Sequence, residues 1–194
     1  SNFALNVLKE LNGLTVERYN KHFQGLDNNL IEEKGATEVP VKNMINLSNA
    51  EVSMYPADDE NIPSRLENLI DGDFNTNWNP MYTTSYLIYE LTLDLKEGKK
   101  INGLRFVQAN YNDNEDAISM APEMIKIYVS NDRVSWKIAT YLEESIIGKT
   151  KGEINDIDFT NEIKNNSYQY VQVRINAGPF GKYFGSRVAE INLY

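Results

Sequence analysis

The chain has 194 residues, of which 41% are hydrophobic and 24% are charged, a balance typical of a soluble globular protein with one good core. A formal net charge of −9 argues against binding to nucleic acid or anionic lipid, because both are negatively charged. The absence of cysteine excludes disulfides, thiolate nucleophiles and cysteine-ligated zinc, and the single histidine, His22, cannot form a multi-histidine metal site.

Residues 1–40 differ in pattern from the rest of the chain. Their apolar residues follow a roughly helical spacing, which Gly13 and Gly25 interrupt. We expect one or two short helices or an irregular segment, or else the tail of a preceding domain, ending in a connector at residues 35–40. The residues that carry the spacing are Leu5, Leu8, Leu11, Tyr19, Phe23, Leu26 and Leu30.

From residue 41 onward the pattern becomes that of β-strands. Residues 87–95 alternate between the two faces of a strand, with Leu or Tyr at every second position, which is typical of a strand with one buried face. Many short strands with no helical stretch between them predict that residues 41–194 form an all-β domain, an antiparallel jelly-roll β-sandwich. Further strands are expected at 101–108, 125–129, 136–141, 154–159, 171–175 and 189–193, with turns at 96–98, 130–132, 148–152 and 177–179.

Residues 68–78 gather hard oxygen donors around one glycine. Asp71, Asp73 and Thr76 offer side-chain oxygens, and Gly72 lets the backbone turn tightly enough for carbonyls to point inward. Calcium prefers such a mixture of carboxylate, carbonyl and hydroxyl oxygens, although an Asp-Gly-Asp sequence is also a common simple turn. An EF-hand is excluded, because the sixth position counted from Asp71 is Thr76 rather than glycine.

Four segments share their residue pattern and their order with one known family. They are Asn68–Trp78, Tyr86–Leu95 with the return strand Ile101–Phe106, Pro122–Trp136, and Tyr170–Arg174 with Ala189–Ile191. With these motifs, the chain from about Asn46 to Tyr194 resembles the discoidin, or coagulation factor 5/8 type C, domain. Arg133 stands where the family usually has a glycine.

The resemblance implies a galactose-binding-like jelly roll, a fold shared by many bacterial carbohydrate-binding modules, and a structural calcium ion. Two carboxylates would balance a divalent cation and leave a neutral cluster that tolerates partial burial. Glu190 lies on the opposite strand parity from Ile191, so it should leave the core face. The ligands that the resemblance implies are Asn68 (carbonyl), Asp71 (carboxylate), Asp73 (mainly carbonyl), Thr76 (carbonyl and hydroxyl), Ala189 (carbonyl) and Glu190 (carboxylate).

Three loops have the side chains that sugar recognition needs. They span residues 79–85, 108–121 and 176–187. A sugar presents a face of C–H bonds and a rim of hydroxyls, which an aromatic ring and planar polar side chains can match. The alternative is that these aromatics pack the loops themselves. The candidate ligand-binding residues are Tyr82, Tyr111, Asn112, Phe180, Tyr183 and Arg187.

The two tryptophans are predicted to be packing anchors. Trp136 follows the strand-and-turn motif, and we assign it a structural role. Trp78 lies nearer the loop rim, where contact with ligand is the alternative to packing.

Taken with the resemblance, these features predict a non-catalytic, calcium-stabilised carbohydrate-binding module. We expect a glycan or polysaccharide partner, an extracellular, cell-surface or periplasmic location in a bacterium, and other domains in a larger surface protein. The alternative is a protein-docking or spacer module of the same fold without a sugar site. An enzyme would need paired carboxylates in a deep cleft, of which the sequence gives no sign. A membrane span is not expected, because no run of about 18 apolar residues occurs.

Overall fold

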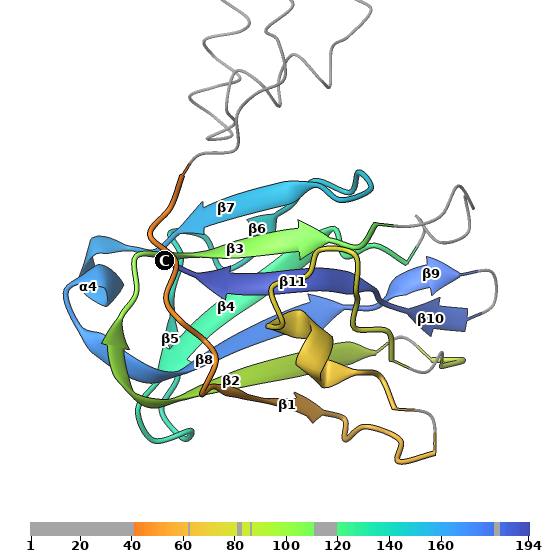
Figure 1. The fold of residues 1–194 in the computed structure, drawn as a ribbon, viewed down its shortest axis with the longest axis horizontal. Coiled ribbons are helices and arrows are strands. Elements are labelled where there is room, and N and C mark those ends of the chain that lie inside the picture. The colour runs from red at the N-terminus through yellow and green to blue at the C-terminus, as the bar shows by residue number, and fades with distance from the viewer. Residues whose placement is uncertain (1–40, 62, 81–82, 86, 111–119, 181–182) are drawn as a thin grey trace, which may run out of the picture. The chain divides into compact units, whose positions relative to one another are not determined.

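Two antiparallel sheets that share one hydrophobic core dominate the part of the chain that the structure describes (Figure 1). The computed structural model describes residues 41–194 apart from 62, 81–82, 86, 111–119 and 181–182. Residues 1–40, predicted to be helical or irregular, lie outside the described residues. Buried side chains from both sheets meet in the core, and this confirms the predicted all-β sandwich.

The larger sheet is built around β2 and β8, the longest of the described strands. Its strand order is β1-β2-β8-β4-β5, with β6 also pairing with β4, and every pairing is antiparallel. The strands are β1 (Glu51–Tyr55), β2 (Ile88–Lys100), β4 (Met124–Ser130), β5 (Lys137–Ile138), β6 (Ser145–Ile146) and β8 (Ser167–Asn176).

The smaller sheet has the order β11-β3-β7, and a separate hairpin is formed by β9 and β10. Two short helical turns join strands. The sequence pattern did not predict them, because four residues are too few to show a helical period. Within the described residues, none of the helices is long and apolar enough to cross a membrane. The elements are η1 (Leu66–Leu69), β3 (Gly103–Gln108), β7 (Ile154–Asp158), α4 (Asn161–Lys164), β9 (Gly178–Phe180), β10 (Tyr183–Gly185) and β11 (Val188–Leu193).

The alternation predicted for residues 87–95 is confirmed in β2. Leu91 and Leu93 are fully buried, whereas Ile88, on the other face, is 45% exposed. Burying each leucine is worth about 1.5–3 kcal/mol relative to leaving it in water, so this pattern decides which face of the strand meets the core. The strands predicted around 125–129, 171–175 and 189–193 are present in the same way as β4, β8 and β11.

The turn predicted at residues 96–98 is wrong. Strand β2 continues to Lys100, and the chain absorbs the irregularity as a bulge between Asp94 and Lys99 in its pairing with β8. Lys96 takes a left-handed conformation at φ 68°, and its N–H donates to Asp94 Oδ1 at 2.8 Å. The local residues do favour a bend, but pairing with β8 resumes beyond it and keeps the strand whole.

The turn predicted at residues 130–132 is confirmed, and it shortens the next strand. Asp132 Oδ1 accepts hydrogen bonds from the backbone N–H groups of Ser135 at 2.7 Å and Val134 at 2.8 Å. These bonds favour the ionised carboxylate and lower the pKa of Asp132 to about 2. Arg133 has φ 60°, the left-handed region in which glycine is easiest, and the strand expected at 136–141 is reduced to Lys137–Ile138.

Candidate functional site

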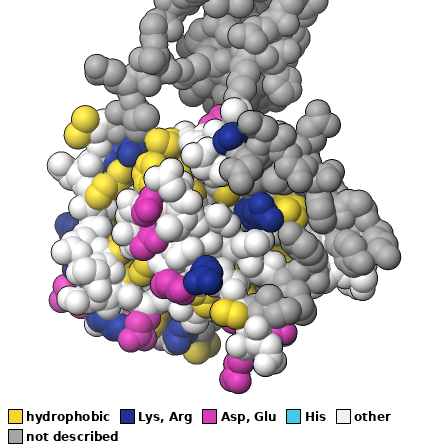
Figure 2. All heavy atoms as spheres, turned by 45° about the vertical axis from the view of Figure 1, so that its right-hand side comes forward, with side chains coloured by type: hydrophobic (Ala, Val, Ile, Leu, Met, Phe, Trp, Pro, Cys, Tyr) yellow, Lys and Arg dark blue, Asp and Glu magenta, His cyan; other side chains and the backbone are white. Residues whose placement is uncertain are grey.

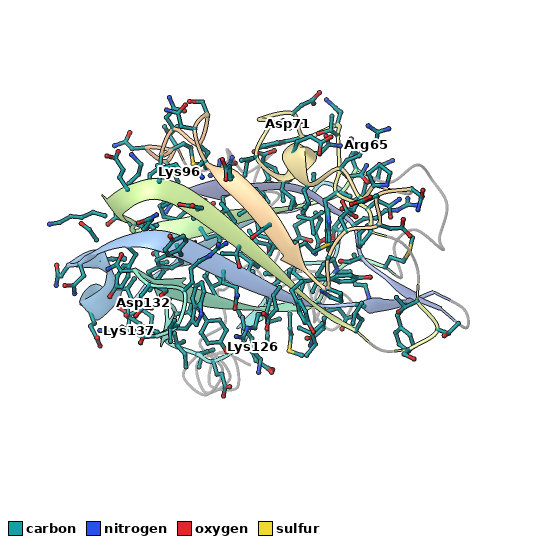
Figure 3. The ribbon with its side chains drawn as sticks, turned by 90° about the horizontal axis from the view of Figure 1, so that it is seen from below. Arg65, Asp71, Lys96, Lys126, Asp132 and Lys137 are labelled. Atoms are coloured by element: carbon teal, nitrogen blue, oxygen red, sulfur yellow. The ribbon has the colours of Figure 1, made fainter. Side chains whose placement is uncertain are left out.

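The acidic loop, residues 70–78, follows η1 and lies against β11. Figure 3 labels Asp71 in this loop. The N–H of Gly72 donates to both carboxylate oxygens of Glu190, at 3.3 Å each. Farther along, Trp78 and Val188 form an antiparallel bridge with N···O distances of 2.8 and 3.2 Å. The structure therefore brings together the first loop and the last strand, segments more than 100 residues apart in sequence.

Within the loop, Asp71 organises the turn. Its Oδ1 accepts from the N–H of Asp73 at 2.8 Å, and its Oδ2 accepts from the hydroxyl of Thr76 at 2.8 Å. Thr76 Oγ1 also lies 2.9 Å from the carbonyl oxygen of Asp73. Gly72 has φ 82°, which an L side chain rarely adopts, so a glycine is needed for this tight turn.

The remaining predicted metal ligands occupy supporting positions. Asp73 turns its carboxylate to the N–H groups of Asn75, at 2.9 Å, and Asn68 closes the base of the loop by donating to the carbonyl of Asn77 at 2.9 Å. Ala189 is buried and falls within the irregularity of the β11–β3 pairing, next to Glu190. Asp71, Asp73, Thr76 and Glu190 are thus linked by direct contacts, whereas Asn68 and Ala189 flank them.

Glu190 is a buried carboxyl group whose pKa is strongly raised. Its side chain is fully buried, and burial raises its pKa to about 8, with the nearby negative charge of Asp71 adding to the effect. Asn192 donates to Glu190 Oε1 at 2.9 Å and offsets part of this cost. In the part of the chain that the structure describes, no lysine or arginine forms an ion pair with Glu190 or Asp71. A buried carboxylate beside a second one needs either a proton or a cation.

The donor chemistry of the loop fits a hard cation of calcium type. Among the described residues, no three carboxylate, histidine or cysteine side chains are grouped closely enough to hold an ion by themselves. An ion bound here would depend on the two carboxylates together with hydroxyl and main-chain carbonyl oxygens, the mixed oxygen set that calcium accepts.

The first and third predicted ligand loops also meet. The N–H groups of Thr83 and Phe184 donate to each other's carbonyls at 2.9 and 2.8 Å. Arg187 Nε donates to Asn79 Oδ1 at 3.3 Å, and the N–H of Asn79 donates to the carbonyl of Ser64 at 2.9 Å. Arg187 lies between β10 and β11, so the Asn79–Arg187 pair is next to the β9–β10 hairpin, which projects from one end of the sandwich (Figure 1).

The two ends of the second predicted loop, residues 108–121, are joined by a side-chain hydrogen bond. Gln108, at the end of β3, donates through Nε2 to the carbonyls of Pro122 at 2.6 Å and Gly148 at 2.8 Å. Gln108 and Pro122 flank the loop, so one side chain ties its two ends together. Sequence reasoning missed Asn79, Thr83 and Gln108, because their roles depend on partners that are distant in sequence.

The predicted ligand residues divide into three groups. Tyr82, Tyr111 and Asn112 lie outside the described residues. Phe180 and Tyr183 are directly paired across the β9–β10 hairpin. Arg187 is half-buried and holds Asn79.

Trp78 does not reach the surface, so the alternative that it contacts ligand is wrong. Its side chain is fully buried and packs edge-on against Tyr89, with ring centroids 5.2 Å apart. Burial of so large a ring makes it a core anchor of the loop end. Trp136 is half-buried, and its indole N–H donates to the carbonyl of Arg133 at 3.1 Å, so it closes the Asp132 turn.

Comparison with known proteins gives one family and a consistent set of folds. Residues 32–188 match the model of the F5/8 type C domain, and no curated protein sequence matches the chain significantly. A family 32 carbohydrate-binding module from Clostridium perfringens NanJ, in complex with galactose, is 16% identical, with 77% of this chain and 96% of that chain covered and a TM-score of 0.56. A putative chitobiase fragment from Bacteroides thetaiotaomicron is 14% identical, with 82% and 95% covered and a TM-score of 0.63. A module of a family 31 glycoside hydrolase from Clostridium perfringens is 18% identical, with 78% and 94% covered and a TM-score of 0.61. At these identities the likeness establishes the fold.

Proposed function

Because this chain belongs to the F5/8 type C domain family, we propose that it is a non-catalytic carbohydrate-binding module. Glycan is recognised by the loops at the end of the sandwich where Asn79 meets Arg187. The observation that carries this proposal is that the first and third loops are joined twice, by the Thr83–Phe184 main-chain pair and by the Arg187–Asn79 side-chain hydrogen bond. A rigid rim loses little ordering entropy when it binds a ligand.

The chemistry of the rim suits a sugar. Arg187 and Asn79 supply a guanidinium and an amide, planar groups that match the hydroxyls of a pyranose ring. The aromatic partner is to be sought among Tyr82, Tyr111, Phe180 and Tyr183, with Asn112 as a further polar contact. The galactose complex of the structurally similar NanJ module supports a sugar as the ligand class.

The distribution of charge argues against nucleic acid as the ligand. Figure 2, which turns the right-hand side of Figure 1 forward, shows basic and acidic side chains interspersed among the described residues. A nucleic-acid site would instead need a field of one positive sign, and the whole chain carries a net charge of −9.

We further propose that a structural calcium ion is bound between the acidic loop and Glu190. It would be held by the carboxylates of Asp71 and Glu190 with oxygens of Asn68, Asp73, Thr76 and Ala189. When bound, the ion supplies the positive charge that a buried carboxylate facing a second carboxylate requires. The chain itself orients the loop through Gly72 and Thr76, and calcium would stabilise that arrangement.

A role in glycan binding implies an extracellular, cell-surface or periplasmic location, and we propose a bacterial source with further domains in the parent protein. The bacterial carbohydrate-binding modules of the same fold support this context.

The proposal is tested by a glycan array followed by isothermal titration calorimetry on the full chain. Arg187→Ala should weaken binding of the best glycan by roughly 10- to 150-fold, because a hydrogen bond from a charged side chain is worth about 1.5–3 kcal/mol. Arg133→Ala is the matched control, since Arg133 follows the end of β4 that points away from the loops. If no glycan binds and a protein partner does, the module is a docking or spacer domain instead.

A further inference from the structure

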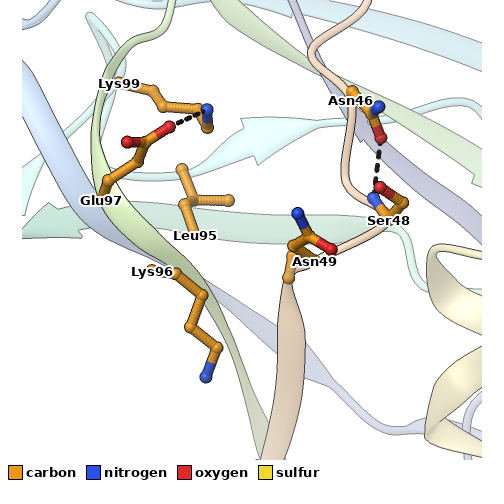
Figure 4. Close-up of a pocket in the computed structure, with 8 residues that line it drawn as sticks. Asn46, Ser48, Asn49, Leu95, Lys96, Glu97 and Lys99 are labelled. Atoms are coloured by element: carbon orange, nitrogen blue, oxygen red, sulfur yellow. Dashed lines mark hydrogen bonds and ion pairs between the residues drawn. The ribbon is translucent and has the colours of Figure 1, made fainter.

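A second concave site lies far from the ligand loops. A cavity of about 380 Å³ opens between residues 46–50, which lead into β1, and the far end of β2 (Figure 4). Strand β2 begins at Ile88, beside the loop end, and its last third forms one wall of the cavity. The volume lies within the range of small-ligand pockets. The residues that line this β1–β2 pocket are Asn46, Ser48, Asn49, Ala50, Leu95, Lys96, Glu97 and Lys99.

The wall from β2 is shaped by the bulge and held in place. Pairing with β8 is interrupted between Asp94 and Lys99, and Lys96 adopts φ 68°. Lys96 Nζ lies 2.6 Å from Glu51 Oε2 on β1 and 3.3 Å from Asp94 Oδ2. Bulges and left-handed non-glycine residues cost free energy and are concentrated near functional sites. The bulge therefore forms one wall of the pocket and is tied by the Lys96–Glu51 ion pair to β1. The opposite wall, residues 46–50, leads directly into β1.

On the opposite wall, the side-chain amides of Asn46 and Asn49 have hydrogen-bonding capacity that the described part of the protein leaves unused. Asn46 Oδ1 accepts from the N–H of Ser48 at 2.9 Å, which leaves the amide NH₂ of Asn46 to donate elsewhere. The exposed side chain of Asn49 makes no hydrogen bond to the rest of the described chain. Figure 4 shows Asn46, Ser48 and Asn49 facing Leu95, Glu97 and Lys99 across the cavity.

The charges of the pocket nearly cancel. Lys96 is neutralised by Glu51 and Asp94, and Lys99 pairs with Glu97 at 2.7 Å. Leu95 is only 4% exposed and packs into the core, so it forms the floor beneath these polar groups and presents little surface of its own. A mainly polar concave surface with amides, a hydroxyl and one balanced ion pair matches a compact, neutral molecule with several hydroxyl groups.

We propose that the β1–β2 pocket binds one neutral sugar ring and is a second carbohydrate site. Asn46 and Asn49 hydrogen-bond its hydroxyls, and the Lys99–Glu97 pair contacts a neighbouring donor and acceptor. Two sites at opposite ends of β2 would let one module bridge two glycan segments, and simultaneous occupation would raise the apparent affinity. This site depends on its own residues and stands even if the loops bind no sugar.

Titration of the ¹⁵N-labelled full chain with galactose, N-acetylglucosamine and galacturonate, read by two-dimensional NMR, tests the proposal. At least one neutral sugar should cause saturable shifts in the Asn46 and Asn49 side-chain amides and in the backbone of residues 95–99, and galacturonate should bind no better. These shifts should persist in Arg187→Ala, whose own signals report the loop site separately.

Asn49→Ala and Lys99→Ala should each weaken this binding by about tenfold. The matched controls are Asn165→Ala and Lys100→Ala, exposed residues of the same types that do not line the pocket. The proposal is overturned if no neutral sugar shifts residues 95–99 in a saturable way. It also fails if both pocket variants bind as well as their controls.

Discussion

With divalent cations removed by a chelator, the free energy of unfolding should fall as the pH rises from about 5 to about 8. Glu190 has a pKa of about 8 in the fold, because it is buried, and an ordinary value of 4.5 when unfolded. Between these values the folded state retains a proton that the unfolded state has lost, so raising the pH favours unfolding. At 1.36 kcal/mol per pKa unit, the full difference is on the order of 4–5 kcal/mol, a large part of the stability of a typical domain.

Calcium should reverse this loss. An ion beside Asp71 and Glu190 favours the ionised carboxylates, so the stabilisation by millimolar calcium should be small near pH 5 and largest near pH 8. Urea denaturation across this pH range, with a chelator or with calcium, measures both slopes. Glu190→Gln should remove most of the pH slope and of the calcium response, whereas the exposed Glu162→Gln should keep both. Metal-free stability that stays flat or rises between pH 5 and 8 would refute the reasoning.

Three further predictions concern stability alone. Gly103→Ala should lower the unfolding free energy by about 1–3 kcal/mol, because its Cβ would come within 2.5 Å of the Ile157 carbonyl and the Tyr194 ring; unchanged urea denaturation would contradict this. Asp132→Ala should lower the melting temperature at neutral pH; in the wild type the same contribution should be present above the ordinary pKa of 3.8 and lost as the pH falls through about 2, which an acid titration followed by circular dichroism can check. Arg133→Gly should change the unfolding free energy by less than about 1 kcal/mol, because relief of the left-handed strain offsets the loss of the Arg133 stack on Tyr170; a loss well above that value would show that the stack dominates.

Much of the fold was predictable because its signals are local. Alternating side chains in residues 87–95 identified the buried face of β2, since burial of Leu91 and Leu93 outweighs any competing preference. The Asp132 turn was equally readable, because an aspartate that accepts nearby N–H groups acts over only three residues. The contact of the acidic loop with Glu190 was expected from the family resemblance, and the structure places the two together.

The candidate ligand sites were only partly predictable. The three loops could be named, and Arg187 with them, but its partner Asn79 is 108 residues away. The bend at residues 96–98 looked like a turn, yet β8 pairs on both sides of it and makes it the bulged wall of a pocket. Neither feature has a signature in a short window of sequence.

The strand pattern, the buried faces and the acidic loop could all be read from the sequence, because each depends on residues a few positions apart and on the free energy of burying apolar side chains. Three properties become visible only in the folded chain: which loops share an end, how deeply Glu190 is buried and where β2 leaves room for a ligand. These properties arise from the order in which distant strands pair, and that order is set by the packing of the whole core.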